Sequence, residues 1–372
     1  MTLADLPPPA RFRSSSDVAD ALRAACETNP DLAACTAIGQ SEEGREILGI
    51  TLGHGPRVVT LVAGAHADEP VGPETLRTLV LEGLAARGWG ADPDGEGTGL
   101  EGLFSRFTFR IVPHVNPDGE AANRPWVERW AELGSDPSAA LASYLVHRRR
   151  EPPGRDVEFG YPAMRTENKA ATGFLFDGGP VALHASLHGM GFSEGALVLV
   201  ERAWLGDPRA DRLVAGFLDA ARGEGLRPHD HDREGDKGFA YGGPGVWSTP
   251  RGRAMQAHFR ARGDDATAAR FHLSSMEMAV AGGGAPLCIV PELPLFVIDD
   301  GSPPTPGVAS MLARFRDRVP ELTLRARRGE SLASAVERFG LRTVPLGVAV
   351  RLQLRLLELA LDAVAPTPPP AS

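Results

Sequence analysis

The chain has few cysteines: only Cys26, Cys35 and Cys288 occur among its 372 residues. An odd number without close spacing does not predict a disulfide framework, so a reducing compartment fits best. The sequence also lacks a long apolar run, because no stretch approaches the roughly eighteen uncharged apolar residues that a membrane span needs. Its N-terminal residues contain no apolar signal-peptide region. We therefore expect a cytoplasmic protein with no membrane segment.

Clusters of basic side chains are scarce as well. The formal net charge is −9, and the densest basic run is Arg148 to Arg150. A polyanionic partner would meet net repulsion, so no nucleic-acid role is expected. Hydrophobic residues make up 42% and charged residues 23%, which are ordinary values for a globular protein and argue against general disorder.

Apolar segments of strand length alternate with helical patterns along most of the chain. Several of these segments are continuously apolar, which is typical of strands buried on both faces of a parallel sheet. The alternation predicts a three-layer α/β/α sandwich around a mixed, mainly parallel sheet, with loops at 88–102 and 227–252. The predicted strands are 47–53, 57–65, 106–115, 180–188, 195–201 and 286–298, and the predicted helices are 16–27, 73–87, 137–150, 165–176 and 208–224.

Polar side chains stand where the predicted parallel strands end. His66 and Glu69 follow the strand at 57–65, His188 ends the strand at 180–188, and Glu292 lies in the strand at 286–298. In open parallel sheets, ligands gather outside the carboxyl ends of the strands. We therefore expect these side chains to meet at one edge of the sheet.

Two imidazoles and a carboxylate are the ligands of a hydrolytic zinc site. Such sites use three protein ligands and leave a position for water, whose pKa the metal lowers. His66, Glu69 and His188 satisfy that count for one zinc ion. Glu292 is available to take the proton of the water and pass it to a leaving group.

A His-x-x-Glu pair alone is weak evidence, because the sequence contains a second one at His231 and Glu234. That second pair lies in a polar loop with no preceding strand, and a solvated turn is its expected role. His184 and His114 are more typical of packed strand histidines, although His184 could also support His188 from behind. Context therefore separates the pair at His66 from the other histidines.

The ordered motifs of the chain resemble those of the zinc carboxypeptidase family, of the carboxypeptidase A type. The resemblance covers roughly residues 36–300, and its pattern is that of a divergent, bacterial-type member. A His-x-x-Glu pair, an Asn-Pro-Asp-Gly turn, a distant histidine on a strand and a glutamate on a late strand follow one another in the family's order. The segments that carry it are IGQSEEGREI (38–47), GAHADEP (64–70), HVNPDGEAANR (114–124), GRDVEFGYP (154–162), SLHG (186–189) and PELPLF (291–296).

This resemblance implies a fold, a cofactor and a set of catalytic roles. His66, Glu69 and His188 are the implied zinc ligands, and Glu292 is the implied general base and acid. The family also places an arginine after the Asn-Pro-Asp-Gly turn to polarise the scissile carbonyl; Arg124 is the nearest candidate and Arg129 the alternative. Residues 1–305 would form the catalytic domain, 306–364 a helical extension packed on it, and 365–372 a disordered tail.

The chain departs from the family where the substrate is bound. The family's Asn-Arg pair, which holds a terminal α-carboxylate, is replaced by Glu158 and Phe159, and the family's mobile tyrosine has no evident counterpart. We expect Glu158, Phe159 and Asn116 to contact substrate, with Lys237 and Tyr241 taking over further contacts. An acidic residue at this position favours a substrate whose recognised group is cationic, amidated or otherwise not a terminal carboxylate.

The expected function is therefore zinc-dependent hydrolysis of a peptide or small amide, with an altered carboxylate-binding pocket. Three alternatives stay open. One is a deacylase of acyl amino acids, related to aspartoacylase and succinylglutamate desuccinylase; another is a peptide-binding relative without catalysis. The third is a serine hydrolase, because residues 191–195 read GFSEG and would make Ser193 the nucleophile, although a strand pattern follows where that motif needs a helix.

Overall fold

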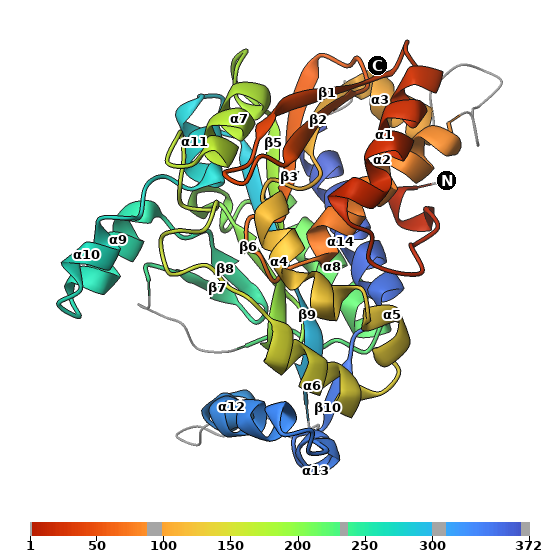
Figure 1. Cartoon of the computed structure of the whole chain (residues 1–372). Coiled ribbons are helices and arrows are strands. Elements are labelled where there is room, and N and C mark those ends of the chain that lie inside the picture. The colour runs from red at the N-terminus through yellow and green to blue at the C-terminus, as the bar shows by residue number, and fades with distance from the viewer. Residues whose placement is uncertain (1, 88–98, 231–236, 300–309, 366–372) are drawn as a thin grey trace.

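The computed structural model describes residues 2–87, 99–230, 237–299 and 310–365 (Figure 1). The predicted α/β class is confirmed: helices cover both faces of one mixed sheet whose strand order is β1-β2-β4-β3-β5-β9-β6-β8-β7, with β10 also paired to β9. Parallel pairing joins β4, β3, β5 and β9 at the centre, and β6 to β8, whereas the remaining pairs are antiparallel. The strands are β1 (Ala33–Gln40), β2 (Glu46–Leu52), β3 (Arg57–Ala63), β4 (Phe107–Val112), β5 (Leu183–Ser193), β6 (Leu197–Val200), β7 (Tyr241–Gly243), β8 (Val246–Ser248), β9 (Leu287–Ile298) and β10 (Leu341–Thr343).

Helices α2, α8 and α14 lie on one side of the sheet, and α7 and α11 lie on the other. Two short 3-10 helices, Leu3–Asp5 and Arg202–Trp204, complete the described helical segments. The α-helices are α1 (Ser15–Thr28), α2 (Val71–Ala85), α3 (Leu100–Arg106), α4 (Pro117–Val127), α5 (Trp130–Leu133), α6 (Pro137–His147), α7 (Thr166–Leu175), α8 (Pro208–Gly223), α9 (Gly252–Arg260), α10 (Asp265–Ala268), α11 (Ser275–Ala281), α12 (Met311–Arg327), α13 (Ala333–Arg338) and α14 (Leu346–Val364).

The alternation of side chains along β5 decides which residues face which layer. Successive side chains of a strand point to opposite faces of the sheet. Leu183, Ala185 and Leu187 belong to the apolar core beneath α2 and α14. The alternate residues His184, Ser186 and His188 therefore point toward the layer of α7 and α11. His188 does not end its strand as predicted: β5 continues to Ser193, and His188 lies in its middle, on a defined face, one residue beyond the pairing of Leu187 with Ala63 at the end of β3.

Elements that the sequence pattern missed lie mainly at the margins of the sheet. Strand β1 was not predicted because it is an edge strand whose side chains are mostly exposed or half-buried, so it shows no apolar run. The segment 227–252, predicted as a loop, contains the three-residue strands β7 and β8. Antiparallel pairing at these margins makes the sheet more mixed than its parallel centre.

The segment 306–364, predicted as an extension, is described from residue 310 onward and joins the main fold directly. Its strand β10 pairs with β9, and α14 contributes Leu352, Leu356 and other residues to the same apolar core as β3 and β5. The predicted tail at 365–372 lies almost entirely outside the described residues. Among the described helices, none has the length and apolar character needed to cross a membrane.

Candidate metal centre

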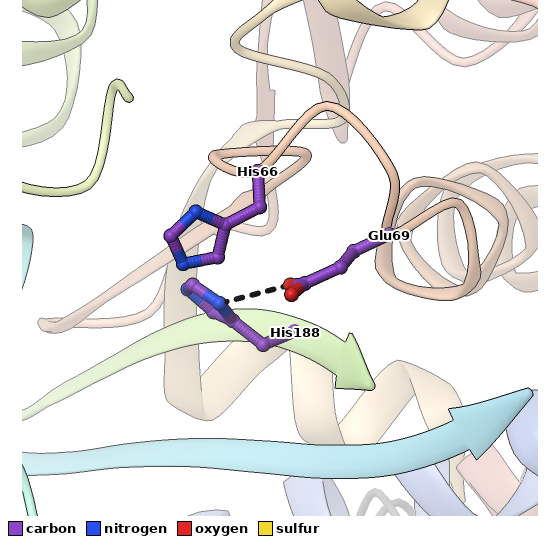
Figure 2. Close-up of side chains that lie close together, drawn as sticks. All are labelled: His66, Glu69 and His188. Atoms are coloured by element: carbon purple, nitrogen blue, oxygen red, sulfur yellow. Dashed lines mark ion pairs between the residues drawn. The ribbon is translucent and has the colours of Figure 1, made fainter. Parts of the chain in front are cut away.

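Three side chains converge at the carboxyl edge of the central strands. His66 lies in the loop after β3, Glu69 stands just before α2, and His188 is part of β5. Their ligand atoms all lie within 4.8 Å of one another, and Figure 2 shows the three side chains pointing to a common space. His188 Nδ1 lies 3.1 Å from Glu69 Oε2, and the two imidazole centroids are 4.8 Å apart.

Two glycines allow the loop and helix that carry these residues to come so close. Gly64 directly follows β3 and has φ +74°, a conformation that favours glycine, and a Cβ there would lie 2.6 Å from the ring of His114. Gly72, in the first turn of α2, sits against β5, where a Cβ would lie 2.2 Å from the carbonyl oxygen of Leu187. Close packing of α2 on β5 therefore sets the distance between Glu69 and His188.

The donor set fits a zinc ion. Zinc bonds to imidazole nitrogen and carboxylate oxygen measure about 2.1 Å, so tetrahedral ligand atoms stand about 3.4 Å apart. The observed separations bracket that spacing, at 3.1 Å for His188 and Glu69 and no more than 4.8 Å for any pair. Only small side-chain movements are needed for all three atoms to meet one ion.

A buried carboxylate holds His188 from behind. Glu158 is only 3% exposed, and its Oε2 accepts a hydrogen bond from His188 Nε2 at 3.0 Å. The hydroxyl groups of Ser186 and Ser275 also donate to Glu158, at 3.1 and 3.2 Å. Because Nε2 carries the proton of this bond, Nδ1 is left to face Glu69 and the space between the donors.

The electrostatics of the cluster favour a positive charge at its centre. Burial opposes the ionisation of Glu69, but His66 and His188 outweigh it and lower the pKa of that carboxyl. Burial likewise opposes protonation of His188, yet the hydrogen bonds to Glu158 and Glu69 raise its pKa well above the ordinary value. The pKa of His66 is also raised, because the negative charges of Glu69 and the half-buried Asp156 outweigh the cost of burial. A site that attracts protons in this way also attracts a divalent cation.

Glu292 stands beside these donors. It is the partner of His188 in the parallel register of β5 and β9, so the two side chains project from the same face of the sheet. Glu292 and Glu69 both line a cavity of about 390 Å³ at this edge. Among the described residues, the structure thus brings together all four side chains that the strand ends suggested.

Arg124 and Arg129, the two candidates for polarising the carbonyl, do not reach this cavity. Arg124 is exposed on α4 and pairs with Glu128 one turn later, and it lines a different cavity beside His114. The reason is helical periodicity: Asn123 and Trp126 occupy the buried face of α4, which turns position 124 toward solvent. Arg129 follows that helix and is also exposed. The sequence-based assignment of Arg124 is therefore not supported by its position.

The residues predicted to contact substrate are mostly engaged elsewhere. Asn116 is fully buried, caps α4 through the amide of Gly119, and donates to Glu151. Phe159 is packed in a small apolar cluster with Met255 and Phe271. Glu158 lies behind His188 rather than in the cavity. The substrate contacts expected for these residues are therefore not possible in this cavity, because their side chains are buried and do not reach it.

Tyr241 lies far along the sheet from the three donors, and Lys237 lies in the turn that precedes its strand. Tyr241 is in β7, the last strand of the sheet order; its hydroxyl donates to Asp230 at 2.8 Å and its ring packs against Trp247. Neither residue lines the cavity that contains Glu69 and Glu292. The second His-x-x-Glu pair, His231 and Glu234, lies outside the described residues.

Ser193, the nucleophile of the serine-hydrolase alternative, is completely buried. Its hydroxyl donates to the carbonyl oxygen of Gly195 at 2.7 Å, within the turn between β5 and β6. The next element in the chain is strand β6, so the helix that this motif needs directly after the serine is not there. This geometry lacks the exposed nucleophile that such a mechanism requires.

Several residues of the site carried no recognisable signal in the sequence. Gln353, in α14, donates to the carbonyl oxygen of His188 at 2.7 Å from a position more than 160 residues away. Ser275 reaches Glu158 from the first turn of α11. Arg148, Arg150 and Arg316 line the cavity with Glu292. Of these, only the basic run at 148–150 stands out in the sequence, where it indicates a cluster of charge and not a functional site.

Comparison with known sequences agrees with this geometry. Residues 18–189 match the model of a family described as zinc carboxypeptidase. Zinc carboxypeptidase A 1 of Drosophila melanogaster is 24% identical over 166 residues, which cover 36% of each chain. Carboxypeptidase D of Homo sapiens is 31% identical over 116 residues, covering 29% of this chain and 8% of that protein. The matched segments thus span about a third or less of these relatives.

Among solved structures, a metallo-carboxypeptidase from Burkholderia cenocepacia has a similar fold. The TM-score is 0.51 at 16% sequence identity, and the superposition covers 95% of this chain and 69% of that one. At this identity the likeness concerns the fold alone. It extends through the C-terminal segment, beyond the residues that the family model matches.

Proposed function

Because the chain belongs to the zinc carboxypeptidase family, we propose that it is a zinc-dependent hydrolase that cleaves a peptide or amide bond. The observation that carries this proposal is the convergence of His66, Glu69 and His188 beside Glu292. In this role His66, Glu69 and His188 hold one zinc ion. When bound, zinc supplies a Lewis acid that lowers the pKa of a coordinated water and polarises a carbonyl group.

The remaining chemistry belongs to the chain's own residues. Glu292 accepts a proton from the attacking water and delivers it to the leaving nitrogen, because its carboxylate shares the cavity with Glu69. Glu158 keeps the Nε2 proton of His188 in place and thereby orients Nδ1 toward the ion.

The substrate end of the mechanism differs from the family pattern. The positions of the family's Asn-Arg clamp hold Glu158 and Phe159, both buried and both engaged within the protein. We infer from these contacts that the carboxylate-binding pocket is altered, so that a group recognising the substrate's end would come from another part of the fold. The hydrolytic step itself does not depend on the clamp.

The proposal is tested by metal analysis combined with two matched variants. Purified protein should hold about one equivalent of zinc, and hydrolysis of a panel of N-acyl dipeptides should stop with a chelator and return with zinc. Glu292→Gln should retain zinc but lose about 10²- to 10⁴-fold in turnover, the usual contribution of general acid–base catalysis. Glu128→Gln, on the exposed end of α4, serves as the control and should match the parent.

Other outcomes would point to the competing functions. Chelator-resistant hydrolysis with covalent capture of Ser193 by a fluorophosphonate would support a serine hydrolase instead. Zinc binding without hydrolysis of any amide would favour a peptide-binding relative. Hydrolysis of N-acyl amino acids but of no dipeptide would place the chain with the deacylases. Near-parental turnover of Glu292→Gln would show that this residue is not the general base.

A further inference from the structure

The cavity beside the metal centre is lined by three arginines. It measures about 390 Å³, near the lower end of the range of about 300–1,000 Å³ for small-molecule sites. Glu69 and Glu292 form its catalytic side, and the backbone from Gly189 to Phe192 contributes to its wall. Arg148 and Arg150, which follow α6, and Arg316, in α12, line the rest together with Val319.

Arg148 and Arg150 are anchored by a buried acidic group. Asp68, between the metal donors of the loop after β3, is 3% exposed and pairs with Arg150 Nε at 2.7 Å. Asp68 also accepts a hydrogen bond from the hydroxyl of Tyr144 at 3.3 Å. Arg148 donates to that hydroxyl at 3.2 Å, and its guanidinium carbon stands 4.9 Å from the Tyr144 ring centre. The two arginines thus share one buried support.

Tyr144, which supports the two arginines, packs against Gly191 in the wall of the cavity. A Cβ at Gly191 would lie 2.1 Å from the Tyr144 hydroxyl oxygen, so only glycine lets the tyrosine pack directly beneath this wall. Tyr144 itself is fully buried, and burial together with Asp68 raises its pKa to about 12. The phenol therefore stays neutral and serves as a fixed hydrogen-bonding support for the cations.

The charges along the cavity favour a negatively charged ligand. Three arginines stand against the carboxylates of Glu69 and Glu292, and a bound zinc ion would add two further positive charges. Arg150 uses Nε for Asp68, which leaves the two terminal nitrogens of its guanidinium as donors. Arginine is suited to carboxylates because its planar fork can donate two parallel hydrogen bonds.

This arrangement reverses the substrate preference inferred from the sequence. An acidic residue at the clamp position favoured a cationic or amidated substrate, but Glu158 is buried behind His188 and is satisfied by three donors. It contributes no acidic wall to the cavity. Among the described residues that line the cavity, the charged groups other than Glu69 and Glu292 are the three arginines.

We propose that the substrate carries a carboxylate close to the scissile amide, and that Arg148, Arg150 and Arg316 bind it in place of the missing clamp. This inference rests on the proposed hydrolase function. The carboxylate can be the α-carboxylate of a C-terminal residue or the side chain of an acidic residue; both present the same group to the cavity. Because Arg316 lies in α12, the C-terminal segment takes part in substrate selection.

The test compares matched substrates in matched variants. N-acyl dipeptides with a free C-terminal carboxylate, the same peptides amidated, and amidated peptides ending in Asp or Glu separate the two sources of the carboxylate. We expect kcat/KM for at least one carboxylate-bearing set to exceed that of the neutral amides. Arg316→Ala should lower that kcat/KM about 10- to 100-fold, mainly through KM, and leave neutral amides within about twofold.

Arg314→Ala is the control for long-range charge. Arg314 lies two positions before Arg316 on α12, is exposed and does not line the cavity. Its replacement therefore removes one positive charge from the same helix without removing a side chain that contacts the substrate. Arg148→Ala should act like Arg316→Ala. Arg316→Glu should weaken carboxylate substrates further and improve an amidated peptide that ends in lysine.

Direct binding to metal-free protein provides a readout without turnover. N-benzoylglycine should bind more tightly than N-benzoylglycinamide by ligand-observed NMR, and Arg316→Ala should remove the difference. Equal kcat/KM on charged and neutral substrates, unchanged by any arginine variant, would overturn the inference while leaving the hydrolase proposal standing. Absence of chelator-sensitive hydrolysis in every protein would overturn the hydrolase proposal itself, whereas binding preference would still report on the arginines.

Discussion

Replacing Glu158 with glutamine measures how much of the zinc affinity depends on the carboxylate behind His188. Glutamine has nearly the same shape, so its carbonyl oxygen can still accept the Nε2 hydrogen bond that the carboxylate accepts at 3.0 Å. Its amide group can face Ser275, whose hydroxyl can then act as the acceptor. The substitution therefore removes the negative charge while keeping the hydrogen bonds and the packing.

The expected loss follows from the nature of the bond. Hydrogen bonds to an ionised partner are roughly twice as strong as neutral ones, and losing such support for a metal-binding histidine typically costs 10- to 100-fold in affinity. We expect the zinc dissociation constant of Glu158→Gln to rise by that factor, which corresponds to about 1.4–2.8 kcal/mol. Nearly complete burial of Glu158 makes solvent screening of the effect small.

The assay is competition with a chromophoric chelator near pH 8, where protons compete less for the histidines. Glu128→Gln, whose parent residue pairs with Arg124 at the surface, is the control and should bind zinc as the parent does. Circular dichroism and the melting temperature of the metal-free proteins show whether the fold is retained. A folded Glu158→Gln protein with a zinc dissociation constant within twofold of the parent would refute the role assigned to this carboxylate.

Three further predictions concern stability and the competing mechanism. Gly191→Ala should destabilise the protein by about 1–3 kcal/mol in urea unfolding, because its Cβ would lie 2.1 Å from the Tyr144 hydroxyl oxygen; unchanged stability would mean that the wall is not tightly packed. Burial lowers the pKa of His114 to about 4 from the ordinary 6.5, so the unfolded state binds more protons between these values. His114 should therefore contribute about 3 kcal/mol of stability that is gained as pH increases across that window, so the stability of His114→Gln should rise by that much less than the parent's when both are unfolded in urea at pH 4 and 7. Ser193→Ala should keep full hydrolytic turnover, because the hydroxyl is buried and bonded to the carbonyl of Gly195; a loss of turnover with retained zinc would revive the serine mechanism.

The centre of the fold was predictable because its signals are local. Strands β3, β5 and β9 are buried on both faces, so they stand out as continuous apolar runs, and parallel strands place their carboxyl ends together. That reasoning alone predicted that His66, His188 and Glu292 lie together at one edge of the sheet. The edge strand β1 escaped notice because half-exposed strands lack such runs.

The substrate side was not predictable because it depends on which face a residue presents after folding. Arg124 sits at the expected distance along the chain, yet the helix turns it to solvent. Glu158 was predicted from its place in the sequence to contact substrate, yet its side chain turns inward to His188. A substitution in a motif shows that a contact is lost, but the new contact depends on tertiary packing.

The C-terminal segment illustrates how distant residues complete the centre. Gln353, in α14, is fully buried; its Nε2 donates to the carbonyl of His188 at 2.7 Å and its Oε1 accepts from the Thr75 hydroxyl at 2.6 Å. Thr75 lies in α2, which directly follows Glu69. One amide thus ties together the helix and the strand that carry two of the proposed ligands. Because a buried amide with both ends satisfied holds its partners in one arrangement, α14 contributes to the geometry of the donors as well as to the core. A boundary at residue 306 would therefore divide the centre itself.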